Sequence, residues 1–148
     1  MTVRRLFTAA VSTVLLLSLA GCGDGEKSYC HALESDQQAF AEMQDDTSGL
    51  ALLKHRTMLH GLADKAPDDL TDEWQTFLGA LDAFAGTLRD VGVEPDQFVD
   101  GKPPAGLGED DRKRIADAAS ELSSPDVVEA ANGIEQHAKD VCKLQLGL

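Results

Sequence analysis

Basic residues are scarce in this chain of 148 residues, which has 13 Lys and Arg against 26 Asp and Glu and a net charge of −13 at pH 7. Proteins that bind nucleic acids usually present a basic patch to the phosphate backbone, so the composition predicts no nucleic-acid partner. Anionic lipid headgroups also repel an acidic surface, which argues against a domain that lies flat on a membrane.

The sequence also lacks the motifs that mark common catalytic and metal sites. It contains no GxSxG nucleophile elbow, no Walker loop, no dinucleotide-binding fingerprint, no HExxH helix and no His–Cys zinc spacing. Carboxylate pairs could in principle serve acid–base chemistry, but aromatic residues make up only 5% of the chain and no aromatic-rich cleft accompanies such pairs. The sequence therefore predicts a protein that is not an enzyme and holds no metal or cofactor.

A third absence is that of β-strand patterns, because no segment alternates convincingly between apolar and polar residues. The clearest periodic segment instead runs from Pro67 to Gly92, where Pro67 suits a first helical turn and Gly92 a helix end. Asp68 and Asp69 lie where the helix dipole favours negative charge. The apolar residues recur at steps of four and three, which predicts one buried helix face: Leu70, Trp74, Phe77, Leu81, Phe84, Leu88 and Val91.

Four further helices are predicted around this segment. They span about residues 28–43, 49–65, 109–122 and 125–142. In the last helix the apolar positions are Val127, Ala131, Ile134, Ala138 and Val141, and their spacing continues through Asn132-Gly133. Phe98, in the Pro- and Gly-rich linker between residues 91 and 108, is expected to pack on the core. Because short connections favour antiparallel neighbours, the sequence predicts an all-α antiparallel bundle of four long helices plus a shorter one.

Three cysteines are present, Cys22, Cys30 and Cys142, so at least one lacks a disulfide partner within the chain. Ahead of Cys22, Arg4 and Arg5 precede a charge-free stretch of 15 residues, 6–20, which has the length of a signal-peptide core rather than a membrane span. The tetrad Leu19-Ala20-Gly21-Cys22 resembles the lipobox of bacterial lipoproteins. This resemblance implies that residues 1–21 are a removed signal peptide and that Cys22 carries lipid, including acyl chains such as palmitate.

A lipid on Cys22 implies a location at the outer face of the cell membrane, since two acyl chains anchor a protein stably. The remaining chain of 127 residues suits one domain, expected over residues 28–148. Without Arg4 and Arg5 its net charge falls to −15. Residues 22–27 are expected to form a flexible tether whose six residues after Cys22 (23–28) reach ~21 Å at most.

Export also bears on Cys30 and Cys142, which are the two cysteines left once Cys22 carries lipid. Disulfides persist outside the cytoplasm, so the pair is expected to form a disulfide rather than to remain as free thiols. Cys30 lies at the start of the first predicted helix and Cys142 at the end of the last. These two ends meet in an antiparallel bundle, so the expected topology and the expected disulfide agree.

Most of residues 28–142 resemble small lipoproteins of actinobacteria. The residues that carry the resemblance are Ser28-Tyr29-Cys30 with His31-Ala32-Leu33, then Ala66-Pro67-Asp68-Asp69 with Trp74, and Val141-Cys142. The resemblance implies a helical, disulfide-closed domain at the cell surface and provides no catalytic residues.

The acidic clusters and the histidines are explained better by structure than by metal binding. Each acidic cluster lies at a predicted helix start, and none has the ligand spacing of an EF-hand loop. His55 falls on an apolar helix face, and His55 and His60 do not share a face. An alternative function nevertheless stays open, in which the bundle holds a metal or small cofactor near His55, Met58 or His137.

One predicted helix, over residues 49–65, is net positive in this acidic chain. Lys54, Arg56 and His60 could form a contact face for an anionic ligand or for an envelope protein partner. The alternative is that these charges neutralise acidic neighbours, because Lys54 and Arg56 flank the buried face by about 100° on either side. We therefore expect at least one of the two to pair with Asp or Glu of an adjacent helix. Taken together, the sequence predicts a lipid-anchored binding or interaction module of unknown ligand.

Overall fold

The computed structural model of the protein describes residues 23–46, 48 and 50–148, and every regular element in that part is helical. The α-helices are α1 (Gly23–Ser35), α2 (Gln37–Asp45), α3 (Ala51–Lys54), α4 (Arg56–Ala63), α5 (Thr71–Asp90), α6 (Glu109–Glu121) and α7 (Pro125–His137). Single turns are η1 (Asp68–Leu70) and η2 (Pro95–Gln97), and the π-helical turn η3 (Ala138–Cys142) continues α7. The predicted all-α fold is confirmed.

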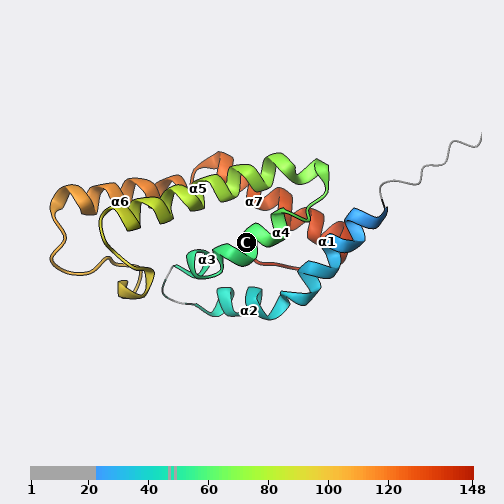
Figure 1. Cartoon of the computed structure of the whole chain (residues 1–148), viewed down its shortest axis with the longest axis horizontal. Coiled ribbons are helices and arrows are strands. Elements are labelled where there is room, and N and C mark those ends of the chain that lie inside the picture. Colours follow the sequence, from blue (N-terminus) through green and yellow to red (C-terminus); the bar gives the residue numbers. More distant parts are fainter. Residues whose placement is uncertain (1–22, 47, 49) are drawn as a thin grey trace, which may run out of the picture.

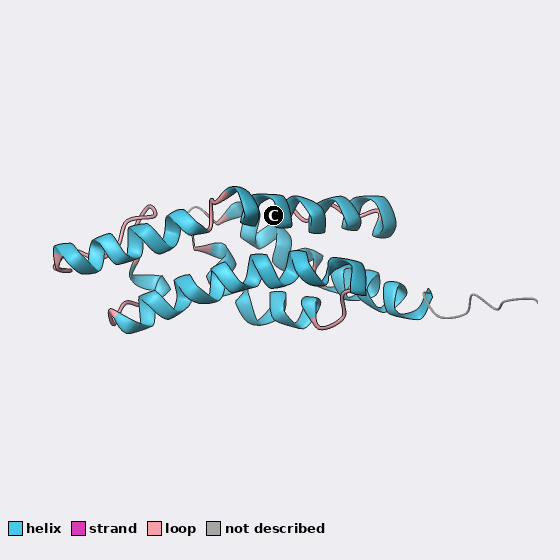
Figure 2. Cartoon of the chain, turned by 90° about the horizontal axis from the view of Figure 1, so that it is seen from above, coloured by secondary structure: helices cyan, strands magenta, loops and turns pink. Residues whose placement is uncertain are grey.

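The helices form four antiparallel segments, α1–α2, α3–α4, α5 and α6–α7 (Figure 1). Figures 1 and 2 both show α6 and α7 in line with one another beside α5. The α5 helix is the central element, because it contacts α3, α4, α6 and α7. This is the predicted bundle, and the predicted short helix is α6.

The apolar face of α5 explains its central position. Six of the seven predicted core residues are buried: Leu70, Trp74, Phe77, Leu81, Phe84 and Leu88. The seventh, Val91, directly follows the helix and is half-buried. The buried residues contribute to two apolar clusters. The larger cluster centres on Trp74 and Leu81, and a smaller one gathers Phe84 and Leu88 with Phe98 and other residues. Phe98 is therefore packed on the core as the sequence predicted.

Two of the predicted helices are interrupted. The first breaks at Asp36 (φ −98°, ψ 8°) into α1 and α2, and the second breaks at His55 (φ −98°, ψ 9°) into α3 and α4. Gln37, which interrupts the apolar stripe of the first helix, lies just after the first break and is exposed. Each break interrupts the regular helical backbone, and the apolar periodicity alone did not reveal it.

The Cys30–Cys142 disulfide joins α1 to η3, with a Cα–Cα distance of 5.1 Å, which confirms the predicted pairing. The predicted inward position of Val141 is wrong, since this side chain is 39% exposed. A π-helical turn takes more residues per turn than an α-helix, so it changes which residues face inward. Ala138 remains buried, but Val141 turns outward and Cys142 reaches α1.

The Asn132-Gly133 pair lies inside α7, as the apolar spacing predicted. Gly133 has a packing role there, because a Cβ atom at this position would lie 3.0 Å from Cγ of Glu73 on α5. The glycine therefore lets Glu73 lie against α7, and this packing offsets the stability that a glycine costs inside a helix.

Residues 143–148 pack back onto the bundle. Leu146 is buried, its carbonyl accepts a 2.9 Å hydrogen bond from Nε2 of Gln44, and its N–H donates to the carboxylate of Glu135. Gly147 (φ +72°) donates to the same carboxylate at 2.9 Å. The segment thus connects α2 to α7 close to the disulfide.

At the other terminus, α1 begins at Gly23, so residues 23–27, which we expected within a tether, are helical here. Residues 24–28 are exposed, and the first buried side chain is that of Tyr29. The predicted signal peptide and Cys22 lie outside the described residues. Across the described part of the chain, no helix combines the length and the apolarity needed to span a bilayer.

Candidate functional site

Lys54, the first residue of the expected contact face, lies at the end of α3 and is bonded to the α2–α3 connection. Its Nζ donates to Oδ2 of Asp46 at 2.6 Å and to Oγ of Ser48 at 3.2 Å. The hydrogen bond from Lys54, followed by those from Ser48, lowers the pKa of Asp46 to about 2. Lys54 therefore stabilises a local turn between two helices.

Arg56 and His60 lie one turn apart on α4 and share one acceptor on α5. Nη1 of Arg56 lies 2.9 Å and Nε2 of His60 lies 3.0 Å from Oδ1 of Asp82. Partial burial would raise the pKa of Asp82, but His60 and then Arg56 outweigh it and lower this pKa below its ordinary value. The expectation that Lys54 or Arg56 pairs with an acidic residue of an adjacent helix is confirmed.

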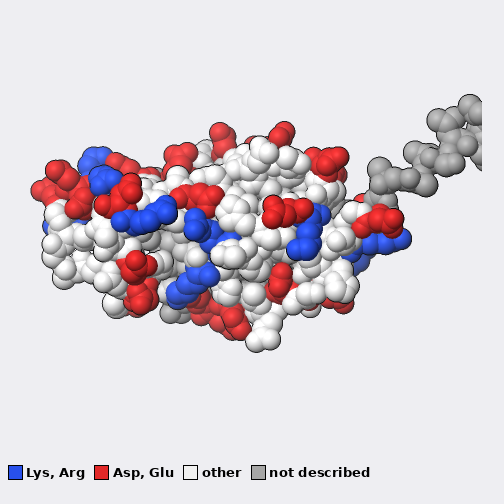
Figure 3. All heavy atoms as spheres, viewed as in Figure 1, with Lys and Arg blue, Asp and Glu red and all other residues white. Residues whose placement is uncertain are grey.

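Basic side chains are also dispersed on a larger scale. On the face drawn in Figure 3, Lys and Arg lie among Asp and Glu rather than in one basic patch. Lys54 pairs with Asp46, and Arg56 shares Asp82 with His60, so acidic residues within the domain offset the charges of Lys54 and Arg56. These pairings favour the neutralising role, and a contact face made by Lys54, Arg56 and His60 stays a prediction.

The four histidines have different surroundings. His31 is exposed on α1 beside Ser35, His55 lies at the α3–α4 break, and His60 contacts Asp82. His137 packs edge-on against Tyr29 with ring centroids 5.8 Å apart, and its Nδ1 is buried without a hydrogen-bond partner. Among the described residues, no group of three or more His, Cys, Asp and Glu has the geometry to hold a metal ion.

A buried polar pair lies next to the disulfide. Nε1 of Trp74 donates a 3.1 Å hydrogen bond to the hydroxyl of Tyr29, which is fully buried. Burial raises the pKa of Tyr29 to about 12, although the hydrogen bond from Trp74 acts in the opposite direction. This pair connects α1 to α5 in the core, so it supports the fold rather than presenting groups to a ligand.

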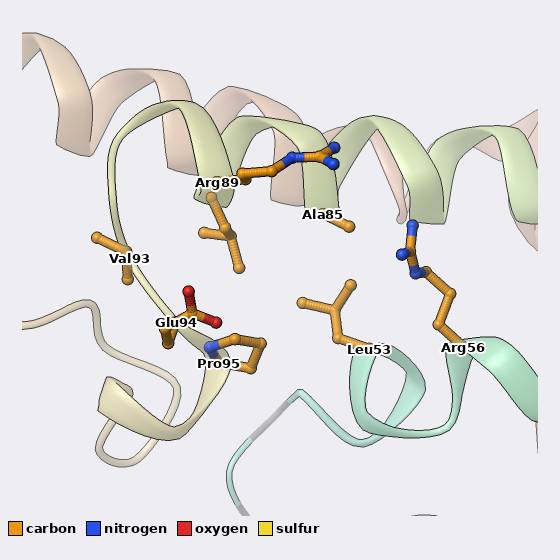
Figure 4. Close-up of a pocket in the computed structure, with 8 residues that line it drawn as sticks. Leu53, Arg56, Ala85, Arg89, Val93, Glu94 and Pro95 are labelled. Carbon is orange, nitrogen blue, oxygen red and sulfur yellow. The ribbon is translucent and has the colours of Figure 1, made fainter.

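A groove of about 220 Å³ opens beside Arg56, between α3–α4 and the last two turns of α5 (Figure 4). We name it the arginine groove, and it is lined by Leu53, Arg56, Ala85, Leu88, Arg89, Val93, Glu94 and Pro95. Leu88 and Val93 are buried members of the smaller core cluster, so the floor of the groove is the outer surface of that core.

The end of α5 builds one wall of the arginine groove. Gly92 (φ +70°) adopts the left-handed conformation, its N–H donates to the carbonyl of Arg89 at 3.1 Å, and the N–H of Val93 donates to the carbonyl of Leu88 at 2.9 Å. These two bonds are those of a Schellman motif, which ends the helix and reverses the chain. Glu94 is consequently brought back beside α5.

The charges of the arginine groove come from three places. In Figure 4, Arg56 reaches from α4 towards α5, Arg89 extends along α5 near Ala85, and Glu94 lies across the groove beside Pro95. Arg56 donates one N–H to Asp82 and has further donors available. Arg89 and Glu94 take part in no ion pair within the described part of the chain.

Sequence reasoning found Arg56 but missed Arg89 and Glu94. Gly92 was expected to end the helix, and this was the one available signal that the chain reverses there. Arg56 is distant in sequence from Arg89 and Glu94, so the packing of α4 on α5 brings it to the groove, and the reversal at Gly92 turns Glu94 back towards it.

The fold and its sites define a disulfide-closed, antiparallel helical bundle with an amphipathic groove beside the end of its central helix. Comparisons of this chain with protein-family models, with curated proteins and with solved structures found no match.

Proposed function

We propose that the protein is anchored to the outer face of the cell membrane through lipid on Cys22 and serves there as a non-enzymatic binding or interaction module. The observation that carries this proposal is the Cys30–Cys142 disulfide, because such bonds persist in oxidising compartments and are rare in the cytosol. The lipobox-like tetrad at residues 19–22 and the resemblance to actinobacterial lipoproteins point in the same direction.

The start of the described fold suits an anchor at this position. Helix α1 begins at Gly23, immediately after Cys22, and residues 24–28 are exposed before the core begins at Tyr29. A lipid on Cys22 would hold this end of the bundle close to the bilayer. The net charge of −15 after loss of the leader would keep the other surfaces away from anionic headgroups.

Binding is favoured over catalysis because of the way polar groups are used. His60 and one N–H of Arg56 are bonded to Asp82, and Tyr29 and Trp74 form a closed pair in the core. The charged groups that stay available beside apolar surface are those of the arginine groove, and they can recognise a ligand without reacting with it.

The anchoring half of the proposal is tested by Cys22→Ala. We expect the variant to lose labelling by radioactive palmitate and to keep its leader, whereas the wild-type chain is labelled and its N-terminus maps to Cys22 by mass spectrometry. Cys30→Ser is the matched control, because it removes a cysteine without touching the lipobox and should be labelled like the wild type. Equal labelling of Cys22→Ala and wild type would overturn the lipid anchor.

A further inference from the structure

We infer that the arginine groove binds an apolar amino acid in its zwitterionic form, with the carboxylate at Arg56 and Arg89, the ammonium group at Glu94 and the side chain on Leu53, Leu88 and Val93. This inference rests on the proposed role as a binding module but is independent of the lipid on Cys22.

The two guanidinium groups provide the recognition of a carboxylate. Arg56 comes from α4 and Arg89 from α5, and both line the same groove. Guanidinium groups bind carboxylates through paired, charge-assisted hydrogen bonds, and Arg56 retains donors beyond the one that Asp82 accepts. The side chain of Arg89 folds back along α5 and its Nη2 lies beside Gly86, where an added Cβ atom would make an ordinary van der Waals contact at 3.7 Å.

Glu94 gives the groove its second sign of charge. Its backbone N–H donates a 2.8 Å hydrogen bond to Oε1 of Gln97, which fixes the residue at the start of η2. The carboxylate lies across the groove from Arg89 and Arg56 (Figure 4). A simple organic anion would be repelled by this carboxylate, whereas a zwitterion would have its ammonium group on that side.

The apolar lining and the volume set the size of the ligand. Leu53, Leu88 and Val93 form the aliphatic floor of the groove, in which Leu53 is the partly exposed residue, and Pro95 and Ala85 complete it. The volume of about 220 Å³ is below the roughly 300–1,000 Å³ typical of pockets for drug-sized ligands. It suits a molecule of the size of free leucine.

The charge of the whole protein favours the same ligand class. A net charge of −13 produces a potential that repels free anions before they reach the groove. A zwitterion has no net charge, so this repulsion does not act on it, and the local arrangement of Arg56, Arg89 and Glu94 decides where it binds.

The test is a titration of the ¹⁵N-labelled full chain carrying Cys22→Ala, in mild detergent, followed by two-dimensional NMR. L-leucine should give saturable shifts of amides in the groove. Leucinamide lacks the carboxylate, N-acetylleucine lacks the ammonium group and glycine lacks the apolar body, so each should bind about tenfold more weakly or worse. The proposal is overturned if leucine gives no saturable shift, or if leucinamide or N-acetylleucine binds as well as leucine does.

Two variants identify the groove as the site. Arg89→Gln should weaken leucine binding about tenfold, while Arg112→Gln, another exposed arginine without an ion pair in the described part, should leave it unchanged. Glu94→Gln should weaken leucine binding but not that of N-acetylleucine. Equal effects of the two arginine variants would refute the site. Because all these proteins carry Cys22→Ala, a failure here leaves the lipid anchor standing, and a failure of the anchor leaves this result standing.

Discussion

Loss of the Cys30–Cys142 disulfide should destabilise the domain by several kcal/mol, although it leaves the helices chemically unchanged. The bond closes a loop with a sequence separation of 112 residues, which is nearly the whole described domain. In the chain-entropy model a cross-link of that length removes about 4.8 kcal/mol of conformational freedom from the unfolded chain at 25 °C. We expect Cys142→Ser to lower the free energy of unfolding by ~2–5 kcal/mol, which is the typical cost of removing a native disulfide from a small domain.

The assay is guanidinium denaturation of the oxidised protein, followed by circular dichroism at the helix band. We expect nearly the same unfolding midpoint for four proteins that lack the cross-link: wild type treated with reductant, Cys30→Ser, Cys142→Ser and the double variant. The denaturant slope should rise in all four, because an unfolded chain without the cross-link exposes more surface.

Two outcomes would refute this reasoning. If the reduced wild type unfolds at the same midpoint as the oxidised protein, the disulfide does not restrict the unfolded chain as the model requires. If instead the effects of Cys30→Ser and Cys142→Ser add up in the double variant, each cysteine contributes through local packing, and the entropy of the loop is not the cause.

Two further predictions test the C-terminal end of the central helix and the core. Gly92→Ala should lower stability by about 1 kcal/mol, because φ is +70° and no atom lies within 4 Å of the added Cβ atom, so the cost is conformational. Gly79 is exposed and lies inside α5, so Gly79→Ala should instead raise stability in the same thermal melts. The pKa of Tyr29 is about 12 in the folded state, whereas in the unfolded chain the residue releases its proton near pH 10. The free energy of unfolding should therefore fall between these two pH values, by up to ~2–3 kcal/mol. Tyr29→Phe should remove that alkaline loss, and an unchanged slope of stability against pH would contradict the prediction.

The parts of the fold that local spacing determines could be predicted from the sequence. The four–three spacing from Leu70 to Leu88 requires one helix with one buried face, and the structure has it. The disulfide followed from the position of Cys30 and Cys142 at helix ends that an antiparallel bundle brings together. These inferences depend on neighbours along the chain or on the order of the helices.

The remaining features depend on contacts between distant residues. The break at His55 and the π-helical turn at Ala138–Cys142 change the direction or phase of a helix, and an unbroken apolar repeat contains no sign of either. Val141 was assigned to the wrong side for this reason. Arg89 and Glu94 were missed because their meeting with Arg56 depends on how α4 packs on α5 and on the reversal of the chain at Gly92.

The disulfide also determines how the domain would respond to a mechanical load. Tension applied between the first and last described residues would enter at Gly23, pass through the Cys30–Cys142 bond and leave at Leu148, so the bundle between the two cysteines would carry none of it. Only the short segments outside the bond could be pulled straight, a length of roughly 45 Å at ~3.5 Å per residue. After reduction, the 112-residue separation would add roughly 390 Å of extensible chain. The redox state of one bond would thus decide whether a pulled domain stays folded or unravels.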